Sequence, residues 1–301
     1  MTPVSPAEGF RPGVLVVFRG ACAVVTIAAG LAGAVMLVAP GETDSYFSWP
    51  IGPPPLAATV GAFYLASAGL FAVLGLRPDW PGAQGVCVAV LAFTIPTVVA
   101  TGRHEDLFDW ARWQALAWAA VFVATPVVFS ALLLLQRGRA PAVGPPLPLL
   151  TRAVLGCLGI AYALLALGLL LAPARLESPS PYDLPGLSGR FMGSWCAFLA
   201  VLAAFALWRN RPRAAAVPLV ALVLWPSAAL VGAVRSFGDL QPSSRRLVYL
   251  LVVAGLAALA AVGFAARPSE DGGAWTRRSR ATTGRGTSPV PTSGDDSSRS
   301  H

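Results

Sequence analysis

The stretch Arg19–Pro40, RGACAVVTIAAGLAGAVMLVAP, decides the fold because its outline returns 133 positions later (152 − 19) as Arg152–Pro173, RAVLGCLGIAYALLALGLLLAP. Each stretch begins with an arginine, continues as an apolar run without further charge and ends in Ala-Pro. About 20 apolar residues are enough for a helix to cross the hydrocarbon core of a bilayer. The two stretches therefore predict two equivalent transmembrane helices.

Further landmarks recur in the same order at a similar offset: Gly61 and Gly193, Arg77 and Arg209, Pro96 and Pro226. Landmarks in constant order at nearly constant offset indicate a duplicated unit. If each unit has four spans, an even number, then both enter the membrane in the same orientation. This predicts halves related by an axis along the membrane normal.

Composition supports a membrane protein, since 55% of the residues are hydrophobic and only 12% are charged. Backbone groups in lipid must be satisfied within the segment, which favours helices. We expect an all-α membrane protein with eight transmembrane helices in two parallel four-helix tandem repeats. The expected spans are Gly20–Val38, Leu56–Leu76, Ala83–Thr101, Trp113–Leu135, Ala153–Leu171, Phe191–Trp208, Ala214–Val234 and Leu247–Ala266.

The predicted organisation has five parts. Residues 1–13 form a polar lead-in, 14–135 the first membrane repeat, 136–149 a cytoplasmic linker and 150–267 the second repeat. Residues 268–301 are rich in Ser, Thr, Gly and Arg, and such a segment cannot bury enough apolar surface to order itself. We expect a disordered cytoplasmic tail there.

The formal net charge of +8 comes from arginines in short loops and in the tail. Their distribution follows no amphipathic face, so we expect no nucleic-acid partner. Arg77, Arg137 and Arg209 fall in loops on one side of the predicted membrane, whereas most acids fall in the opposite loops. The positive-inside rule then predicts that both termini are cytoplasmic, in a bacterial inner membrane.

Two matched proline segments, Thr94–Thr97 and Leu224–Ser227, lie midway along the third and seventh expected spans. Proline frees a backbone carbonyl, and interrupted helices at matching positions of two halves point to a central binding site. The alternative is a pair of structural kinks inherited by duplication. The candidate ligand contacts are Thr94, Pro96, Thr97, Trp225, Pro226 and Ser227.

Arg19 and Arg152 begin corresponding apolar runs. They are candidate contacts for an anionic ligand or a lipid headgroup. The competing interpretation is that both side chains snorkel to the membrane interface and set the orientation.

The connections Ser45–Pro55 and Ser178–Gly186 are both rich in aromatic residues and proline. Tyr and Trp favour the headgroup level, so interfacial anchoring is expected, with a re-entrant or lid-like outer gate as the alternative. Small residues line the helices that follow, beginning at Gly61 and Gly193, and small residues let helix backbones approach closely. We expect these two helices to form the interface between the halves.

The sequence contains no H-E-x-x-H, P-loop, G-x-S-x-G or G-x-G-x-x-G signature, so we expect no enzymatic activity and no cofactor. His104 stands near three acids, but no second histidine lies nearby. A solvated loop is therefore the preferred interpretation, and no metal site is expected. The four cysteines lie in apolar runs and are expected to be small buried hydrophobes.

The segments Phe47–Leu56 and Gly61–Ser67 resemble a region of uncharacterised multi-pass membrane proteins of high-GC bacteria. That resemblance implies a membrane location and carries no activity.

Two functions remain open. One is a transporter or permease-like protein. Its ligand would be neutral or hydrophobic, because no charged side chain is expected inside the membrane to bind an ion. The other is a non-transporting scaffold or accessory subunit that binds a protein partner through its tail or outer loops. Both have the lipid bilayer as a partner, and the two differ in whether a central cavity is wet. A third and less favoured hypothesis is a membrane enzyme that acts on lipid.

Overall fold

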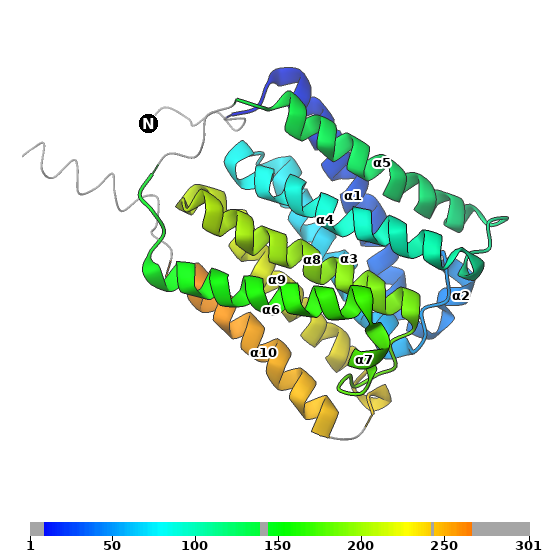
Figure 1. Cartoon of the computed structure of the whole chain (residues 1–301). Coiled ribbons are helices and arrows are strands. Elements are labelled where there is room, and N and C mark those ends of the chain that lie inside the picture. Colours follow the sequence, from blue (N-terminus) through cyan, green and yellow to red (C-terminus); the bar gives the residue numbers. More distant parts are fainter. Residues whose placement is uncertain (1–8, 139–143, 242–243, 267–301) are drawn as a thin grey trace, which may run out of the picture. The chain divides into compact units, whose positions relative to one another are not determined.

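The computed structural model describes residues 9–138, 144–241 and 244–266. Eight helices in these ranges are long and apolar enough to cross a membrane, and these ranges contain no strand (Figure 1). The eight are α1 (Pro12–Val38), α3 (Pro54–Leu76), α4 (Trp80–Arg103), α5 (Trp113–Leu135), α6 (Leu149–Leu171), α8 (Gly186–Arg209), α9 (Pro212–Arg235) and α10 (Ser244–Ala265). The prediction of an all-α, multi-pass membrane protein is confirmed.

Five shorter helices lie in the described parts of the connections. They are η1 (Pro40–Glu42), α2 (Thr43–Tyr46), η2 (Glu105–Leu107), α7 (Pro173–Glu177) and η3 (Phe237–Asp239). The expected tail, 268–301, lies outside the described residues, as do parts of the lead-in and of the linker.

Local chemistry explains several helix ends. Helices α1, α3, α4 and α9 carry proline in their first turn, where its missing N–H group would have had no helical partner. The Asp79 carboxylate accepts a hydrogen bond from the Gly82 amide at 3.2 Å and so caps α4. Helix α8 ends at Arg209 and is followed by Asn210, whose φ of 47° lies in the left-handed region that caps helices.

Helix α1 begins at Pro12, earlier than the span expected from Gly20. Its first turns bury Val14 and Phe18, which gives the helix a packed face before the arginine. Arg19 therefore lies seven residues into the helix, about 10 Å from its start at 1.5 Å per residue. The expectation that Arg19 opens the helix was wrong because a charged residue need not end an apolar helix.

The matched prolines do not interrupt their helices. Helix α4 continues through Pro96, and α9 continues through both Pro218 and Pro226. The expected helix breaks are therefore absent at these positions. A proline removes one hydrogen bond, and a membrane helix tolerates that loss where neighbouring helices and hydroxyl groups surround it.

The helices pair in the same way in residues 9–138 (the first half) and residues 144–266 (the second half). Helix α1 packs along α3 and α5 along α4, while α6 packs along α8 and α10 along α9 (Figure 1). Between the halves, α3 packs on α9 and α4 packs on α8. Helices α3, α4, α8 and α9 consequently form the interior, with α1, α5, α6 and α10 at the periphery.

Glycines allow close packing within each half. A Cβ at Gly61 of α3 would lie 2.7 Å from the Cβ of Met36 in α1, and one at Gly33 would lie 2.6 Å from the Gly61 carbonyl oxygen. In the second half, a Cβ at Gly193 would lie 2.9 Å from the Cβ of Leu169. Gly61 and Gly193 thus join α1 to α3 and α6 to α8. The helices that carry them, α3 and α8, also pack on α9 and α4 of the other half, which agrees with the interface expected for these helices.

Two other glycines stand between the halves. A Cβ at Gly232 of α9 would lie 2.7 Å from the Cα of Thr59, and one at Gly85 of α4 would lie 2.7 Å from the Phe205 ring. Backbones approach closely where no side chain intervenes. These contacts fix α9 on α3 and α4 on α8.

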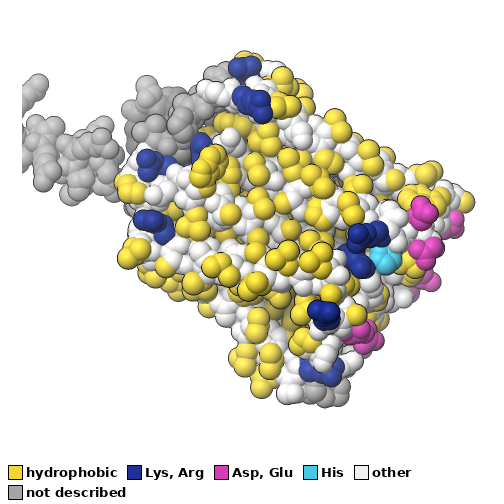
Figure 2. Space-filling view, viewed as in Figure 1, with side chains coloured by type: hydrophobic (Ala, Val, Ile, Leu, Met, Phe, Trp, Pro, Cys, Tyr) yellow, Lys and Arg dark blue, Asp and Glu magenta, His cyan; other side chains and the backbone are white. Residues whose placement is uncertain are grey.

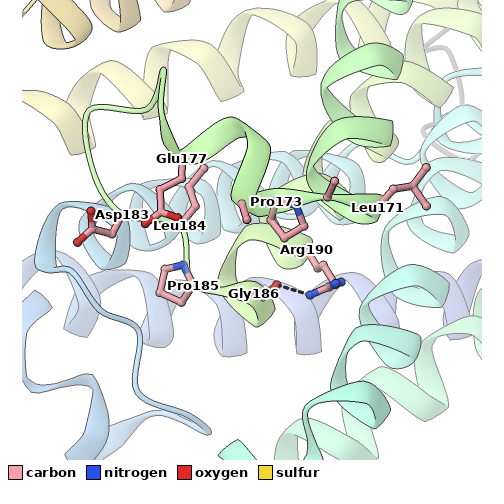
Figure 3. A pocket seen from close by; sticks show the side chains of 10 residues that line it. Leu171, Pro173, Glu177, Asp183, Leu184, Pro185, Gly186 and Arg190 are labelled. Atoms are coloured by element: carbon pink, nitrogen blue, oxygen red, sulfur yellow. Dashed lines mark hydrogen bonds between the residues drawn. The ribbon is translucent and has the colours of Figure 1, made fainter.

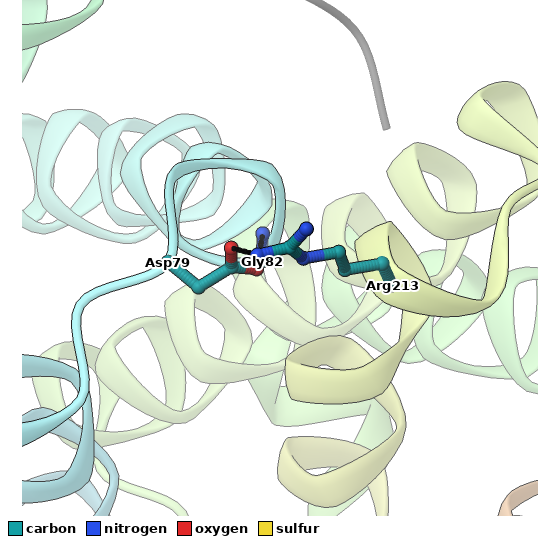
Figure 4. Close-up of polar contacts among 3 residues, drawn as sticks. All are labelled: Asp79, Gly82 and Arg213. Carbon is teal, nitrogen blue, oxygen red and sulfur yellow. Dashed lines mark hydrogen bonds and ion pairs between the residues drawn. The ribbon is translucent and has the colours of Figure 1, made fainter. Parts of the chain in front are cut away.

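The surface separates into an apolar middle and two polar ends. Figure 2 shows a broad hydrophobic face, with arginines at both ends and acids gathered at one. We call that end, where α1 ends and α3 begins, the acid-bearing end, and the other the opposite end. At the opposite end Arg213 of α9 pairs with Asp79 at 2.8 Å (Figure 4). An apolar girdle between polar ends is the surface that a bilayer requires.

Candidate functional site

A cavity of about 700 Å³ lies in the first half, between α1, α3, α4 and α5. Its inner wall reaches the second half at Trp195, Phe198 and Trp225. Every described residue that lines it is uncharged. Its volume falls within the range of about 300–1,000 Å³ that is common for small-molecule sites.

The cavity opens sideways, between α1 and α5. Val17 and Val24 of α1 line it and are still 53% and 61% exposed, and Val121 of α5 is 42% exposed. Helix α5 packs on α4 and makes little contact with α1. In a membrane this opening faces lipid.

Hydrogen bonds close the cavity at the acid-bearing end. The Ser48 hydroxyl donates to the Gln114 carbonyl at 2.9 Å. The Arg112 guanidinium donates to the carbonyls of Asp44 and Ser45 in α2. The connection between α1 and α3 is therefore tied to the start of α5.

The opposite end is also closed. The Gln136 side chain, 2% exposed, donates to the Gly9 carbonyl at 3.4 Å and accepts from the Arg11 amide at 3.3 Å. Phe10 packs edge-on against Trp80, with ring centroids 5.3 Å apart. The end of α5 is thus joined to the segment that leads into α1, and the side between the two helices remains the opening.

Most hydroxyl groups on the wall are already satisfied. Ser67, Thr94 and Thr125 each donate to the carbonyl four residues earlier in their own helix, at 2.6–2.8 Å. The Tyr64 hydroxyl and the Gln114 side-chain amide make no hydrogen bond within the described ranges. These two groups are therefore available to form hydrogen bonds with a ligand.

Aromatic rings form the inner wall. The Phe93 and Trp195 ring centroids are 4.1 Å apart, and those of Trp195 and Trp225 are 5.5 Å apart. The indole N–H groups of Trp195 and Trp225 are buried and have no acceptor in the described structure. Because an unpaired donor is unfavourable in an apolar interior, this wall keeps some unused hydrogen-bonding capacity.

The structure brings only part of the predicted central site together. Thr94 and Trp225 lie on the cavity wall. Thr97, 1% exposed, donates to the Phe93 carbonyl at 2.8 Å, and Ser227 donates to Val223 in the same way. The four residues off the wall are Pro96, Thr97, Pro226 and Ser227.

Arg19 and Arg152 are both exposed, and neither lies on the cavity wall. Arg152 stands in the first turn of α6, whereas Arg19 is farther along α1. Their proposed contact with an anionic ligand or lipid headgroup stays a prediction.

The connection between α1 and α3 was predicted as an interfacial anchor, but its main rings are inside the protein. Phe47 and Trp49 are 8% and 2% exposed, and Trp49 packs against Trp118 with ring centroids 4.6 Å apart. The Trp49 indole donates to the Ser188 hydroxyl at 3.3 Å, which links the two halves. The alternation of Phe47, Trp49 and Ile51 is the sequence signal that could have predicted this burial.

Tyr46, next to these rings, donates its hydroxyl to the Ala39 carbonyl at 2.8 Å. Burial, and then the Glu42 carboxylate, raise the pKa of Tyr46 above its usual range. The hydroxyl therefore stays protonated and keeps this hydrogen bond.

A second pocket of about 500 Å³ lies at the acid-bearing end, between α7 and the start of α8 (Figure 3). Arg190 donates to the Gly186 carbonyl at 3.0 Å and lies 2.9 Å from Nε2 of His104. Since arginine only donates, this Nε2 is the acceptor. His104 therefore contacts the second half, rather than standing in a fully solvated loop as expected. Glu177 and Asp183 line the same pocket.

Among the residues with described positions, no group of three or more His, Cys, Asp or Glu is placed to hold a metal ion. Comparison with protein-family models, with curated proteins and with solved structures gave no match to this chain. The fold and the cavity define the class: a multi-pass α-helical membrane protein with a lateral apolar cavity.

Proposed function

We propose that this protein is a permease-like, non-enzymatic membrane protein that binds a neutral, apolar ligand in the cavity of its first half. The uncharged wall of the 700 Å³ cavity is the observation that carries the proposal. Removing a charge from water into such a site is strongly unfavourable without a partner, so ions are poor ligands. Tyr64 and the indoles of Trp195 and Trp225 supply the few polar contacts.

We further propose that the two halves are a tandem repeat in one orientation. Helix ends support this: Val38 and Leu171 are 133 positions apart (171 − 38), and Arg103 and Arg235 are 132 apart (235 − 103). The equivalent pairing of helices within each half supports it too.

The proposed orientation places the acid-bearing end outside and both termini in the cytoplasm of a bacterial inner membrane. The arginines of the tail, added to Arg77, Arg137 and Arg209 at the opposite end, support it through the positive-inside rule. The acid-bearing end also carries arginines, so the support comes mainly from the tail. Those at the acid-bearing end are Arg103, Arg112, Arg175, Arg190, Arg235, Arg245 and Arg246. Reporter fusions after residue 138 and after residue 301 should both report the cytoplasm. A periplasmic signal from either fusion contradicts this orientation.

The binding proposal is tested with a compact apolar photoprobe, trifluoromethylphenyl diazirine, on the full-length protein in phosphatidylcholine vesicles. We expect labelling to concentrate on the facing sides of α1 and α5. Ala124→Phe fills the cavity wall and should reduce that labelling several-fold. Val123→Phe, on the neighbouring lipid-facing position, is the matched control and should leave it unchanged. Equal labelling of α6 and α10 would refute the proposal.

A non-transporting scaffold is the second candidate, and one observation favours it. The region around Thr97 and Ser227 is packed, with Thr97 only 1% exposed. Single cysteines at these two positions, in a chain without its native cysteines, report water access to an impermeant thiol reagent. Labelling from either side supports a transport path through the centre, and protection from both sides supports the scaffold.

A further inference from the structure

We propose that the ligand is one acyl chain of a bilayer amphiphile, which enters between α1 and α5 with its polar head toward the acid-bearing end. This deepens the proposed function and rests on it. Under the proposed orientation, the amphiphile comes from the outer leaflet.

The route of entry follows from the closures at the two ends of the cavity. Ser48 and Arg112 tie the α1–α3 connection to α5 at one end, and Gln136 ties α5 to the lead-in segment at the other. A solute from either aqueous side meets these contacts first. A molecule already in the bilayer meets only Val17, Val24 and their neighbours at the open side.

The dimensions match an extended chain. On α5 the wall runs from Trp113 to Phe129, and the 16 steps between them (129 − 113) span about 24 Å at 1.5 Å per residue. Dividing the volume of about 700 Å³ by this length gives a mean cross-section of roughly 30 Å². Carbon atoms pack at about 3.5–4.0 Å, so one hydrocarbon chain needs on the order of 20 Å². The cavity is therefore a slot that holds a single chain along most of the hydrocarbon thickness of about 30 Å.

Polarity along the slot gives the chain a direction. At the acid-bearing end the wall contains Ser48 and the unpaired side-chain amide of Gln114. Toward the opposite end it contains Val17, Gly20 and Phe129, which offer no polar side-chain atom. A polar head is stabilised at the first end, and a terminal methyl at the second.

The test uses phosphatidylcholine that carries a diazirine either near the head or near the terminal methyl of one chain. The full-length protein is reconstituted in phosphatidylcholine vesicles with a trace of one probe, irradiated and mapped by peptide mass spectrometry. We expect the head-proximal probe to label α5 near Trp113 and the methyl-proximal probe to label near Phe129. Both should exceed labelling of α6 and α10 several-fold.

Two wall variants and two matched controls make the test specific. Ala124→Phe and Ala28→Phe obstruct the slot from α5 and α1 and should lower labelling by both lipid probes several-fold. Val123→Phe and Ile27→Phe add the same ring on lipid-facing positions and should not. Thermal unfolding in detergent shows whether each variant is folded. Because two wall positions are used, the test can still be made if one of the two variants does not fold.

Each outcome is decisive. Labelling that shifts along α5 with the position of the diazirine, and that the wall variants suppress, supports the acyl-chain proposal. Equal labelling by the lipid probes on all four peripheral helices overturns it. If the compact aryl probe still labels the slot in that case, ligand binding stands and the ligand is a compact molecule. If neither probe prefers the slot, both proposals fall.

Discussion

The two halves use the same helix order, yet one is open where the other is closed. In the second half α10 packs directly on α6: the Thr151 hydroxyl donates to the Gly263 carbonyl at 3.4 Å, and a Cβ at Gly263 would lie 2.7 Å from Val154. In the first half the matching helices, α1 and α5, stand apart around a 700 Å³ cavity. The difference shows that the same order and pairing of helices can leave a cavity in one half and a direct contact between the corresponding helices of the other.

Side-chain size explains the difference. Helix α5 buries Trp118, Phe122 and Phe129, which pack toward the interior, with Phe122 5.7 Å from the Phe93 ring centroid. Helix α10 fully buries only Val253, Ala260 and Gly263, and its rings, Tyr249 and Phe264, are only partly buried against the core. Large rings hold α5 against the interior and away from α1, whereas Gly263 lets α10 reach α6.

The largest expected loss of stability comes from filling the close glycine contact that each half has between its peripheral helix and its interior helix. Gly61→Leu and Gly193→Leu each force a side chain into a contact shorter than 3.0 Å between packed helices. We expect each to destabilise the protein by about 3 kcal/mol or more, at the upper end for overpacked cores. Thermal unfolding in detergent measures this. Gly69→Ala, with no neighbour within 4 Å, is the control. A stable leucine variant in one half alone would show that the halves do not share this contact.

The next prediction compares the stability of the two halves when the same ring is added to each. Gly263→Phe adds a ring where Val154 already stands and should cost about 1–3 kcal/mol. Ala124→Phe adds the same ring beside the cavity and should leave the unfolding temperature nearly unchanged. The same unfolding measurement compares the pair. Equal destabilisation would mean that the space between α1 and α5 is as tightly packed as the contact between α6 and α10.

A smaller effect is expected where the first half is tied at its acid-bearing end. Arg112→Ala removes the guanidinium that binds the α2 carbonyls, and we expect a loss of about 1 kcal/mol, below the range for buried charged hydrogen bonds because Arg112 is partly exposed. A cysteine at Ala117, on the cavity wall, should then react faster with an impermeant thiol reagent. Arg112→Lys should restore part of the protection. Unchanged reactivity in the alanine variant would show that this tie does not keep water out.

The smallest effect is expected at the link between halves at the opposite end. Asp79 and Arg213 are 30% and 37% exposed, and such half-exposed pairs contribute about 1 kcal/mol or less. Asp79→Asn removes the charge and keeps an oxygen for the helix cap, so unfolding should shift little. Asp79→Ala also removes the cap and should cost about 1 kcal/mol more. A large effect of the asparagine variant would assign this ion pair a role in holding the halves together.

Some features followed from the sequence and others did not. Apolar runs such as Trp113–Leu135 predicted helix and membrane together, and that helix has those bounds in the structure. The prolines Pro96 and Pro226 predicted helix breaks, but α4 and α9 continue through them. Of the predicted central site only Thr94 and Trp225 reach the cavity, because its walls come from helices of both halves.

The sequence by itself determined that this is an all-α, multi-pass membrane protein. Lipid offers the backbone no hydrogen-bond partner, so each apolar run of about 20 residues must satisfy its own groups as a helix, and that requirement acts within one segment. The tertiary structure alone decided where a cavity remains. Trp49 meets Ser188, and Phe93 meets Trp195, across more than a hundred positions of sequence. The space between α1 and α5 depends on how such distant side chains fit together, and no local pattern encodes that fit.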